Sequence, residues 1–137
     1  MPEDSKSAYS TSVIPFKVLV VDDNEINRML AKKVLSKFNF NVITADSGLE
    51  AIDMLKAKDF DVVLMDIHMP AMSGYETAQT LRSMDDIYFK EVPIIALTAS
   101  IMIDELKIIH EFGMTDYQIK PFKPDELYQK INKYLKK

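Results

Sequence analysis

The sequence contains no cysteine. This absence excludes a disulfide framework, a thiolate nucleophile and a cysteine-based zinc site, and it is typical of proteins from a reducing compartment. The net charge of −4 leaves no positive surplus for nucleic acid, and no basic block stands out. The apolar runs are too short to cross a bilayer, and no charged-then-apolar secretion signal opens the chain. We therefore expect a cytoplasmic chain that contacts neither nucleic acid nor a membrane.

The chain has 137 residues, of which 47% are hydrophobic and 28% are charged. This length and composition are typical of one globular domain with a core of ordinary size. Residues 1–15 are rich in serine and charge and lack a hydrophobic period, so we interpret them as a flexible N-terminal arm or linker. We expect a single domain over residues 16–137.

Short runs of β-branched residues predict five strands. The runs span residues 18–21, 42–44, 62–65, 94–97 and 117–119. Because most of them are apolar without alternation, the strands belong in a parallel sheet that helices cover on both faces. Five strands alternating with five helices then give a doubly wound α/β fold.

Helix signals lie between the predicted strands. The first helix is indicated by apolar residues at helical spacing on one face and along its border: Ile26, Leu30 and Val34, with Ala31, Leu35 and Phe38 beside them. Ser47 and Ser73 each precede a glutamate by three residues, the spacing of a capping box that opens a helix. Proline in the first turn marks the start of the last helix near residues 123–126, and Gly113 is expected to end the fourth.

The predicted strands end in residues that carry a charge or a hydroxyl group. Asp22 and Asp23 follow the first run, and Asp66 ends the third within "FDVVLMDIHMP". Thr98 follows the fourth run, and Lys120 follows the fifth. Since ligands of such sheets bind outside the carboxyl ends of the strands, we expect these five side chains to share a shallow pocket.

Three carboxylates and one lysine in that pocket sum to a charge of −2, which is unfavourable unless something neutralises it. A divalent cation would do so, and hard oxygen ligands favour Mg²⁺. Taken singly, each of these residues is an ordinary turn, strand or surface residue. Only their convergence indicates a functional site.

Four segments carry a family resemblance over about Lys17 to the C-terminus. They are "VLVVDDNEINRML", "DVVLMDIHMPAMSGYE", "PIIALTAS" and "GMTDYQIKPF", and they resemble the receiver domain of two-component response regulators. "DDNEIN" and "DIHMP" look most like receivers attached to hybrid sensor histidine kinases. The resemblance implies a flavodoxin-like fold with a five-stranded parallel sheet in the order 2-1-3-4-5.

The resemblance also implies a role for each matching residue. Asp66 matches the phosphoacceptor, and Asp23 matches the main acidic ligand of Mg²⁺. Asp22 matches the residue that supports the metal through water. His68 matches the position whose backbone carbonyl binds the metal.

Four further positions match the family pattern. Thr98 and Lys120 match the residues that contact the phosphoryl oxygens. Tyr117 matches the aromatic switch residue, and Pro121 the proline that follows the lysine in a cis peptide link. No position of the pattern departs from the family.

The predicted function is that of a phosphoacceptor signalling module. Asp66 takes a phosphoryl group from a histidine kinase or a histidine phosphotransfer domain, with Mg²⁺ and Lys120 keeping the nucleophile ionised. Thr98 then moves toward the phosphoryl group and Tyr117 turns inward, which regulates a partner. The domain promotes its own phosphotransfer and dephosphorylation and is not otherwise an enzyme.

Alternatives remain at several positions. The His68 side chain could itself bind the metal, although a modest influence on phosphate hydrolysis is favoured. In the fourth helix, Ile101, Ile108 and Phe112 could pack under neighbouring loops. Alternatively, this helix could form a partner or homodimer face together with the fifth strand and fifth helix.

Two rival functions on related sheets fit less well. A phosphatase of the haloacid dehalogenase type needs a second acid two residues after its nucleophile, where this chain has His68. A flavin-binding electron carrier needs a hydroxyl- and glycine-rich phosphate loop after the first strand, where Asp22 and Asp23 would repel a phosphate.

Overall fold

The computed structural model describes residues 15–99 and 103–135. In this part of the chain, five parallel strands form one sheet in the order β2-β1-β3-β4-β5. The strands are β1 (Lys17–Val21), β2 (Asn41–Ala45), β3 (Val62–Asp66), β4 (Ile94–Thr98) and β5 (Asp116–Ile119). Both the predicted fold class and the predicted strand order are confirmed. The predicted arm lies almost wholly outside the described residues.

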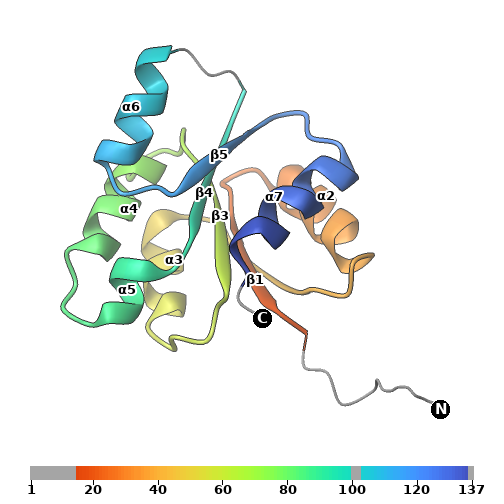
Figure 1. Ribbon diagram of the computed structural model, residues 1–137, viewed down its shortest axis with the longest axis horizontal. Coiled ribbons are helices and arrows are strands. Elements are labelled where there is room, and N and C mark those ends of the chain that lie inside the picture. The colour runs from red at the N-terminus through yellow and green to blue at the C-terminus, as the bar shows by residue number, and fades with distance from the viewer. Residues whose placement is uncertain (1–14, 100–102, 136–137) are drawn as a thin grey trace.

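Helices cover both faces of the sheet (Figure 1). They are α2 (Glu25–Ser36), α3 (Gly48–Leu55), α4 (Gly74–Arg82), α5 (Ile87–Glu91), α6 (Ile103–Glu111) and α7 (Pro124–Tyr134). Helices α2 and α7 lie together on one face, and α3, α4 and α5 lie on the other. No helix within the described residues is long and apolar enough to span a membrane.

Two clusters of buried apolar residues lie on the two faces of the sheet. Ala31 and Leu35 of α2 pack with Leu127 and Ile131 of α7 in one cluster, while the other gathers apolar residues of α3, α4, α5 and α6. All five residues of β3 and all five of β4 are buried. A strand that is covered on both faces gains from being apolar throughout, which explains the lack of alternation in its sequence.

The local helix signals hold in the structure. The Ser47 side chain accepts a hydrogen bond from the Glu50 N–H, and Ser73 with Glu76 forms a complete capping box at the start of α4. Gly113 follows the end of α6 with φ of +90°, and a Cβ there would lie 2.6 Å from Arg82 Cγ. Glycine is needed at this position for both reasons.

One expectation needs correction, and one point that the sequence left open is decided. A sixth helix, α5, precedes β4, where we expected five helices in all; it has five residues and an Asp86 cap, so it is too short to show a helical period. On α2 the face that packs on the sheet carries Ala31 and Leu35, while Leu30 is 54% exposed. The two apolar stripes are adjacent, and the helical period alone does not say which one meets the sheet.

Candidate functional site

Neighbouring strands bring the acidic residues together at the carboxyl edge of the sheet. Strand β1 lies directly beside β3, with Val21 opposite Met65. The next residue on each strand is therefore an aspartate, Asp22 on one side and Asp66 on the other. Carboxylate oxygens of Asp22, Asp23 and Asp66 all lie within 4.8 Å of one another. The predicted convergence of the three acids is present in the structure.

Lys120 reaches the same place from the end of β5. Its backbone N–H donates a hydrogen bond to the Thr98 carbonyl at 2.7 Å, which holds it beside the end of β4. Its Nζ lies 3.3 Å from Asp22 Oδ2 and 3.5 Å from Asp66 Oδ1. The ammonium group thus bridges two of the three carboxylates.

The three carboxylates differ in their surroundings. Asp22 is only 2% exposed, and both of its oxygens have partners, since Oδ1 accepts from the Asn24 N–H at 2.9 Å and Oδ2 faces Lys120. Asp66 is 7% exposed, whereas Asp23 is exposed to solvent. The open side of the cluster is therefore formed by Asp23 and Asp66.

The charge on Asp66 is incompletely balanced. Burial raises the pKa of Asp66 above its usual value, and the charges of Asp22 and Asp23 add to the rise. Lys120 and a hydrogen bond from the His68 N–H at 3.3 Å lower it by less. Among the described residues, three carboxylates face the single ammonium group of Lys120, so the cluster carries a surplus of negative charge.

This donor set fits a hard divalent cation. Each acid offers a carboxylate oxygen, and such oxygens are the ligands that Mg²⁺ accepts, usually from one or two carboxylates with water completing the shell. A bound cation would also offset the repulsion from Asp22 and Asp23, which adds to the effect of burial on the pKa of Asp66. Asp22, Asp23 and Asp66 are the residues that could hold it.

The other predicted positions lie around this cluster. Thr98 is the last residue of β4 and is buried. His68 is exposed just beyond β3. Tyr117 is half-buried on β5 and packs against the core, and the peptide bond between Lys120 and Pro121 is cis.

A comparison with models of protein families shows which family this chain belongs to. The model of the response regulator receiver domain matches residues 18–132. The chain belongs to the receiver domain family. That match includes every strand end described above.

Individual relatives agree with this family. The receiver domain is 38% identical over 127 residues to a hybrid signal transduction histidine kinase of Dictyostelium discoideum, covering 89% of this chain but 7% of that protein. Among solved structures, the chemotaxis protein CheY4 of Vibrio cholerae is 30% identical with a TM-score of 0.83, covering 89% of this chain and all of that one.

A third relative bears on the metal. The receiver domain of a sensor histidine kinase from Pseudomonas aeruginosa is 29% identical with a TM-score of 0.80, and its structure has a magnesium ion coordinated in the active-site cleft. The match covers 88% of this chain and 98% of that one.

Two supporting residues of this receiver domain were missed in the sequence. Gly74 packs on the backbone of Asp66, because a Cβ there would lie 2.4 Å from the Asp66 carbonyl oxygen; only its place in a capping box was recognised. Arg28 donates from Nη1 to the Asp22 carbonyl at 2.7 Å. In the sequence, this contact could have been suspected from the position of Arg28, which lies one helical turn after Asn24, the N-cap residue of α2.

An apolar cavity adjoins the acidic cluster on the α2 side. It measures about 450 Å³, and its lining includes Leu30, Val34 and Phe122 together with Asp22 and Lys120. The outer surface of α2 continues it, with Ile26, Met29 and Leu30 exposed to 67%, 65% and 54%. The site therefore opens beside an exposed apolar helix face.

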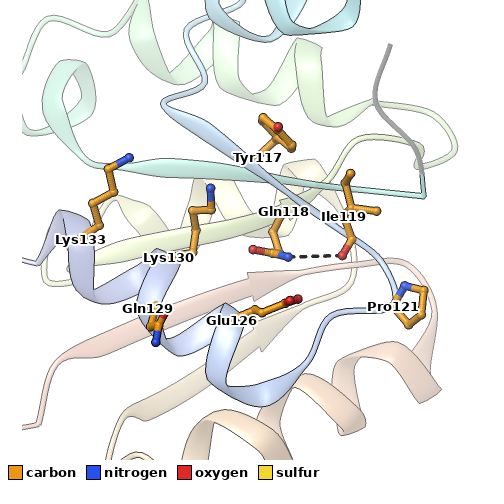
Figure 2. A pocket seen from close by; sticks show the side chains of 8 residues that line it. All are labelled: Tyr117, Gln118, Ile119, Pro121, Glu126, Gln129, Lys130 and Lys133. Atoms are coloured by element: carbon orange, nitrogen blue, oxygen red, sulfur yellow. Dashed lines mark hydrogen bonds between the residues drawn. The ribbon is translucent and has the colours of Figure 1, made fainter. Parts of the chain in front are cut away.

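A second hollow lies over β5 and α7 (Figure 2). Its lining includes Tyr117, Ile119, Glu126 and Lys130. The Lys130 ammonium lies 5.3 Å from the centre of the Tyr117 ring, so the predicted switch residue borders this hollow rather than the acidic cluster.

Helix α6, which corresponds to the fourth predicted helix, only partly supports a separate apolar face. Ile101 lies outside the described residues. Ile108 is half-buried, and the Phe112 ring packs against Tyr75 of α4 with 5.1 Å between ring centres. Phe112 therefore serves contacts within the domain.

Proposed function

We propose that this receiver domain takes a phosphoryl group onto Asp66 from a histidine kinase or a histidine phosphotransfer domain, in a Mg²⁺-dependent reaction. The observation that carries the proposal is the surplus of negative charge around Asp66, with the Lys120 ammonium 3.5 Å from its Oδ1. A buried carboxylate with one shared cation has the surroundings expected of a nucleophile that works with a divalent metal.

The residues act as follows. A carboxylate oxygen of Asp66 forms a bond to phosphorus while the bond from phosphorus to the donor imidazole breaks, and its electron pair returns to the imidazole nitrogen. Lys120 stabilises negative charge on the phosphoryl oxygens. Asp22, Asp23, Asp66 and the His68 carbonyl would hold Mg²⁺, which would supply further charge neutralisation. Attack of water on the acyl phosphate then restores Asp66.

The same site gives the domain a conformational output. Thr98 ends β4 beside Lys120, so a small shift brings its hydroxyl to a phosphoryl group on Asp66. Tyr117 lies opposite Ala96 in the neighbouring strand and turns inward when Thr98 moves. The domain then has two packing arrangements, and phosphorylation favours one of them. A partner that binds this arrangement more tightly responds to phosphorylation.

The donor docks on the exposed face of α2. Ile26, Met29 and Leu30 form an apolar surface that is continuous with the cavity at Asp22 and Lys120. A protein that presents a phosphohistidine must bring it to that cavity, and a helix or loop beside the histidine would cover this surface.

The face formed by α6, β5 and α7 is proposed as the output or homodimer surface. Ile119 is 38% exposed on β5, and the hollow of Figure 2 joins this strand to α7. The support is the position of Tyr117 in that hollow, because its movement would change the surface.

The function is tested by intact mass after incubation with Mg²⁺ and phosphoramidate. The wild type should gain one phosphoryl group, and the matched Asp66→Asn variant should gain none. Wild-type protein that stays unmodified with both this donor and a cognate histidine kinase would contradict the proposal. So would a phosphorylated Asp66→Asn variant.

The docking surface is tested separately with Leu30→Glu. Phosphorylation by phosphoramidate should be unchanged, while transfer from a phosphohistidine protein should slow by about tenfold or more, because a central apolar contact is lost. The matched control is Leu49→Glu on α3, where Leu49 is also exposed. Equal transfer to both variants would contradict docking on α2.

A further inference from the structure

The exposed acid of the cluster has little to hold it in place. Asp22 is fixed by Asn24 and Lys120 through its carboxylate oxygens. Within residues 15–99 and 103–135, no hydrogen bond or ion pair reaches the Asp23 carboxylate. Its position therefore depends on the backbone that carries it.

Arg28 holds that backbone. Its Nη1 donates to the Asp22 carbonyl oxygen at 2.7 Å, and this carbonyl belongs to the peptide unit that joins Asp22 to Asp23. A peptide unit is planar, so fixing its oxygen fixes the direction in which the chain enters Asp23. Hydrogen bonds from a charged donor are about twice as strong as neutral ones.

Arg28 is itself well anchored. Its backbone N–H donates to the Asn24 carbonyl at 3.1 Å in the first turn of α2. The Asn24 side chain caps the same helix by accepting from the Asn27 N–H at 3.1 Å, and the side chain of Arg28 is half-buried. The guanidinium group therefore links the loop after β1 to the first turn of α2.

We propose that Arg28 is a positioning residue for the cation site: it orients the peptide unit that carries Asp23, and through it the Asp23 carboxylate. This inference rests on the proposed Mg²⁺-dependent function. Groups that orient metal ligands in this way usually affect metal affinity by about 10- to 100-fold when they are removed.

Charge and positioning make opposite predictions for Arg28. The guanidinium is a positive charge near a cation site, so charge alone predicts that its removal strengthens Mg²⁺ binding. Loss of positioning predicts weaker binding, because Asp23 is then free to move. The sign of the change in affinity separates the two effects.

The experiment measures the dissociation constant of Mg²⁺ by calorimetry for the wild type, Arg28→Met, Arg28→Lys and Lys32→Met. We expect about tenfold weaker binding for Arg28→Met. Arg28→Lys should recover most of the affinity, since lysine keeps the charge and one donor. Lys32→Met removes an exposed charge from the same helix and should not weaken binding.

A second measurement follows the backbone amide signal of Asp23 by NMR in the metal-free protein. The signal should shift in Arg28→Met and return toward the wild-type position in Arg28→Lys. Equal or tighter Mg²⁺ binding by Arg28→Met, with the Asp23 signal unmoved, would overturn the role of Arg28 alone. Wild-type protein that binds no Mg²⁺ would overturn the proposed metal-dependent function as well.

Discussion

Asp66 and Asp116 are two poorly exposed carboxylates at opposite ends of the same sheet. Asp66 ends β3 at the carboxyl edge, and Asp116 begins β5 at the other edge. Burial raises the pKa of both groups. The net result differs: the pKa of Asp66 stays above its usual value, whereas the contacts of Asp116 bring its pKa below that value.

Asp116 is surrounded by donors. It accepts hydrogen bonds from the Tyr134 hydroxyl and from the Tyr117 N–H, and Lys130 Nζ lies 3.4 Å from each carboxylate oxygen. Against the effect of burial, these contacts hold the pKa of Asp116 below its usual value. In turn, the pKa of Tyr134 is raised to about 12 by burial and by this hydrogen bond to Asp116.

Asp66 has two acidic neighbours and only a share of one lysine. Burial raises the pKa of Asp66, and Lys120, which also faces Asp22, does not offset this rise. The carboxylate of Asp116 has its charge balanced within the protein and ties α7 to β5, whereas Asp66 is the acid that we propose works with a bound cation. The contrast separates a structural acid from a functional one.

The largest predicted effect comes from removing the structural acid. Asp116→Ala leaves Lys130 and Tyr134 without their acceptor, and we expect the free energy of unfolding to fall by about 2 kcal/mol. Urea denaturation measures it. Lys133→Ala is the control, since Lys133 is exposed and 3.9 Å from Asp116, and it should change stability by less than about 0.5 kcal/mol. Equal effects of the two variants would contradict the structural role.

The second prediction concerns cation binding by the acids around Asp66. Mg²⁺ at about ten times its dissociation constant should raise the free energy of unfolding by about 1.4 kcal/mol. The rise should be lost on chelation with EDTA and should be strongly reduced in Asp23→Asn. Thermal unfolding with and without the ion measures it, and an undiminished rise in Asp23→Asn would place the cation elsewhere.

The smallest effect is a gain in stability. Because the folded pKa of Asp66 is raised, the folded state holds its proton to higher pH than the unfolded chain, where the pKa is about 3.9. Ionisation of Asp66 therefore costs stability as pH rises through that window. Metal-free Asp66→Asn should therefore be more stable than the wild type at pH 7, by less than the effect of Mg²⁺.

This gain should disappear below about pH 3.9, where the acid is neutral in both states. Asp116 has the opposite sign: its lowered pKa contributes stability that is present above that pH and lost as the pH falls through the folded value. Urea denaturation over a pH series compares Asp66→Asn and Asp116→Asn directly. Parallel pH profiles for the two variants would contradict the comparison.

Much of the fold could be predicted because its signals are local. Uniformly apolar runs mark strands that are buried on both faces, and Ser47 and Ser73 mark helix starts through contacts within one turn. The short α5 was missed because one turn of helix has no period. The sequence did not indicate which face of α2 packs on the sheet, because two apolar stripes lie side by side on it.

The residues that meet at the site could be predicted from the sequence, but the balance of charge among them could not. A parallel sheet brings its carboxyl ends to one edge, so Asp22, Asp66, Thr98 and Lys120 could be placed together from their order in the chain. The sequence contains both Asp66 and Asp116 at strand ends. Their neighbours in the sequence do not show that Asp116 has its charge balanced and that Asp66 does not.

The order of residues was enough to predict the parallel sheet, the convergence of acids with a lysine at its edge, and the family. It did not show which acid is exposed, which acid has its charge balanced, or that Arg28 donates a hydrogen bond to the Asp22 carbonyl. These properties depend on distances between residues far apart in the chain, such as Lys120 and Asp22. Electrostatic energy depends on those distances and on burial, and neither is set by the order of residues alone.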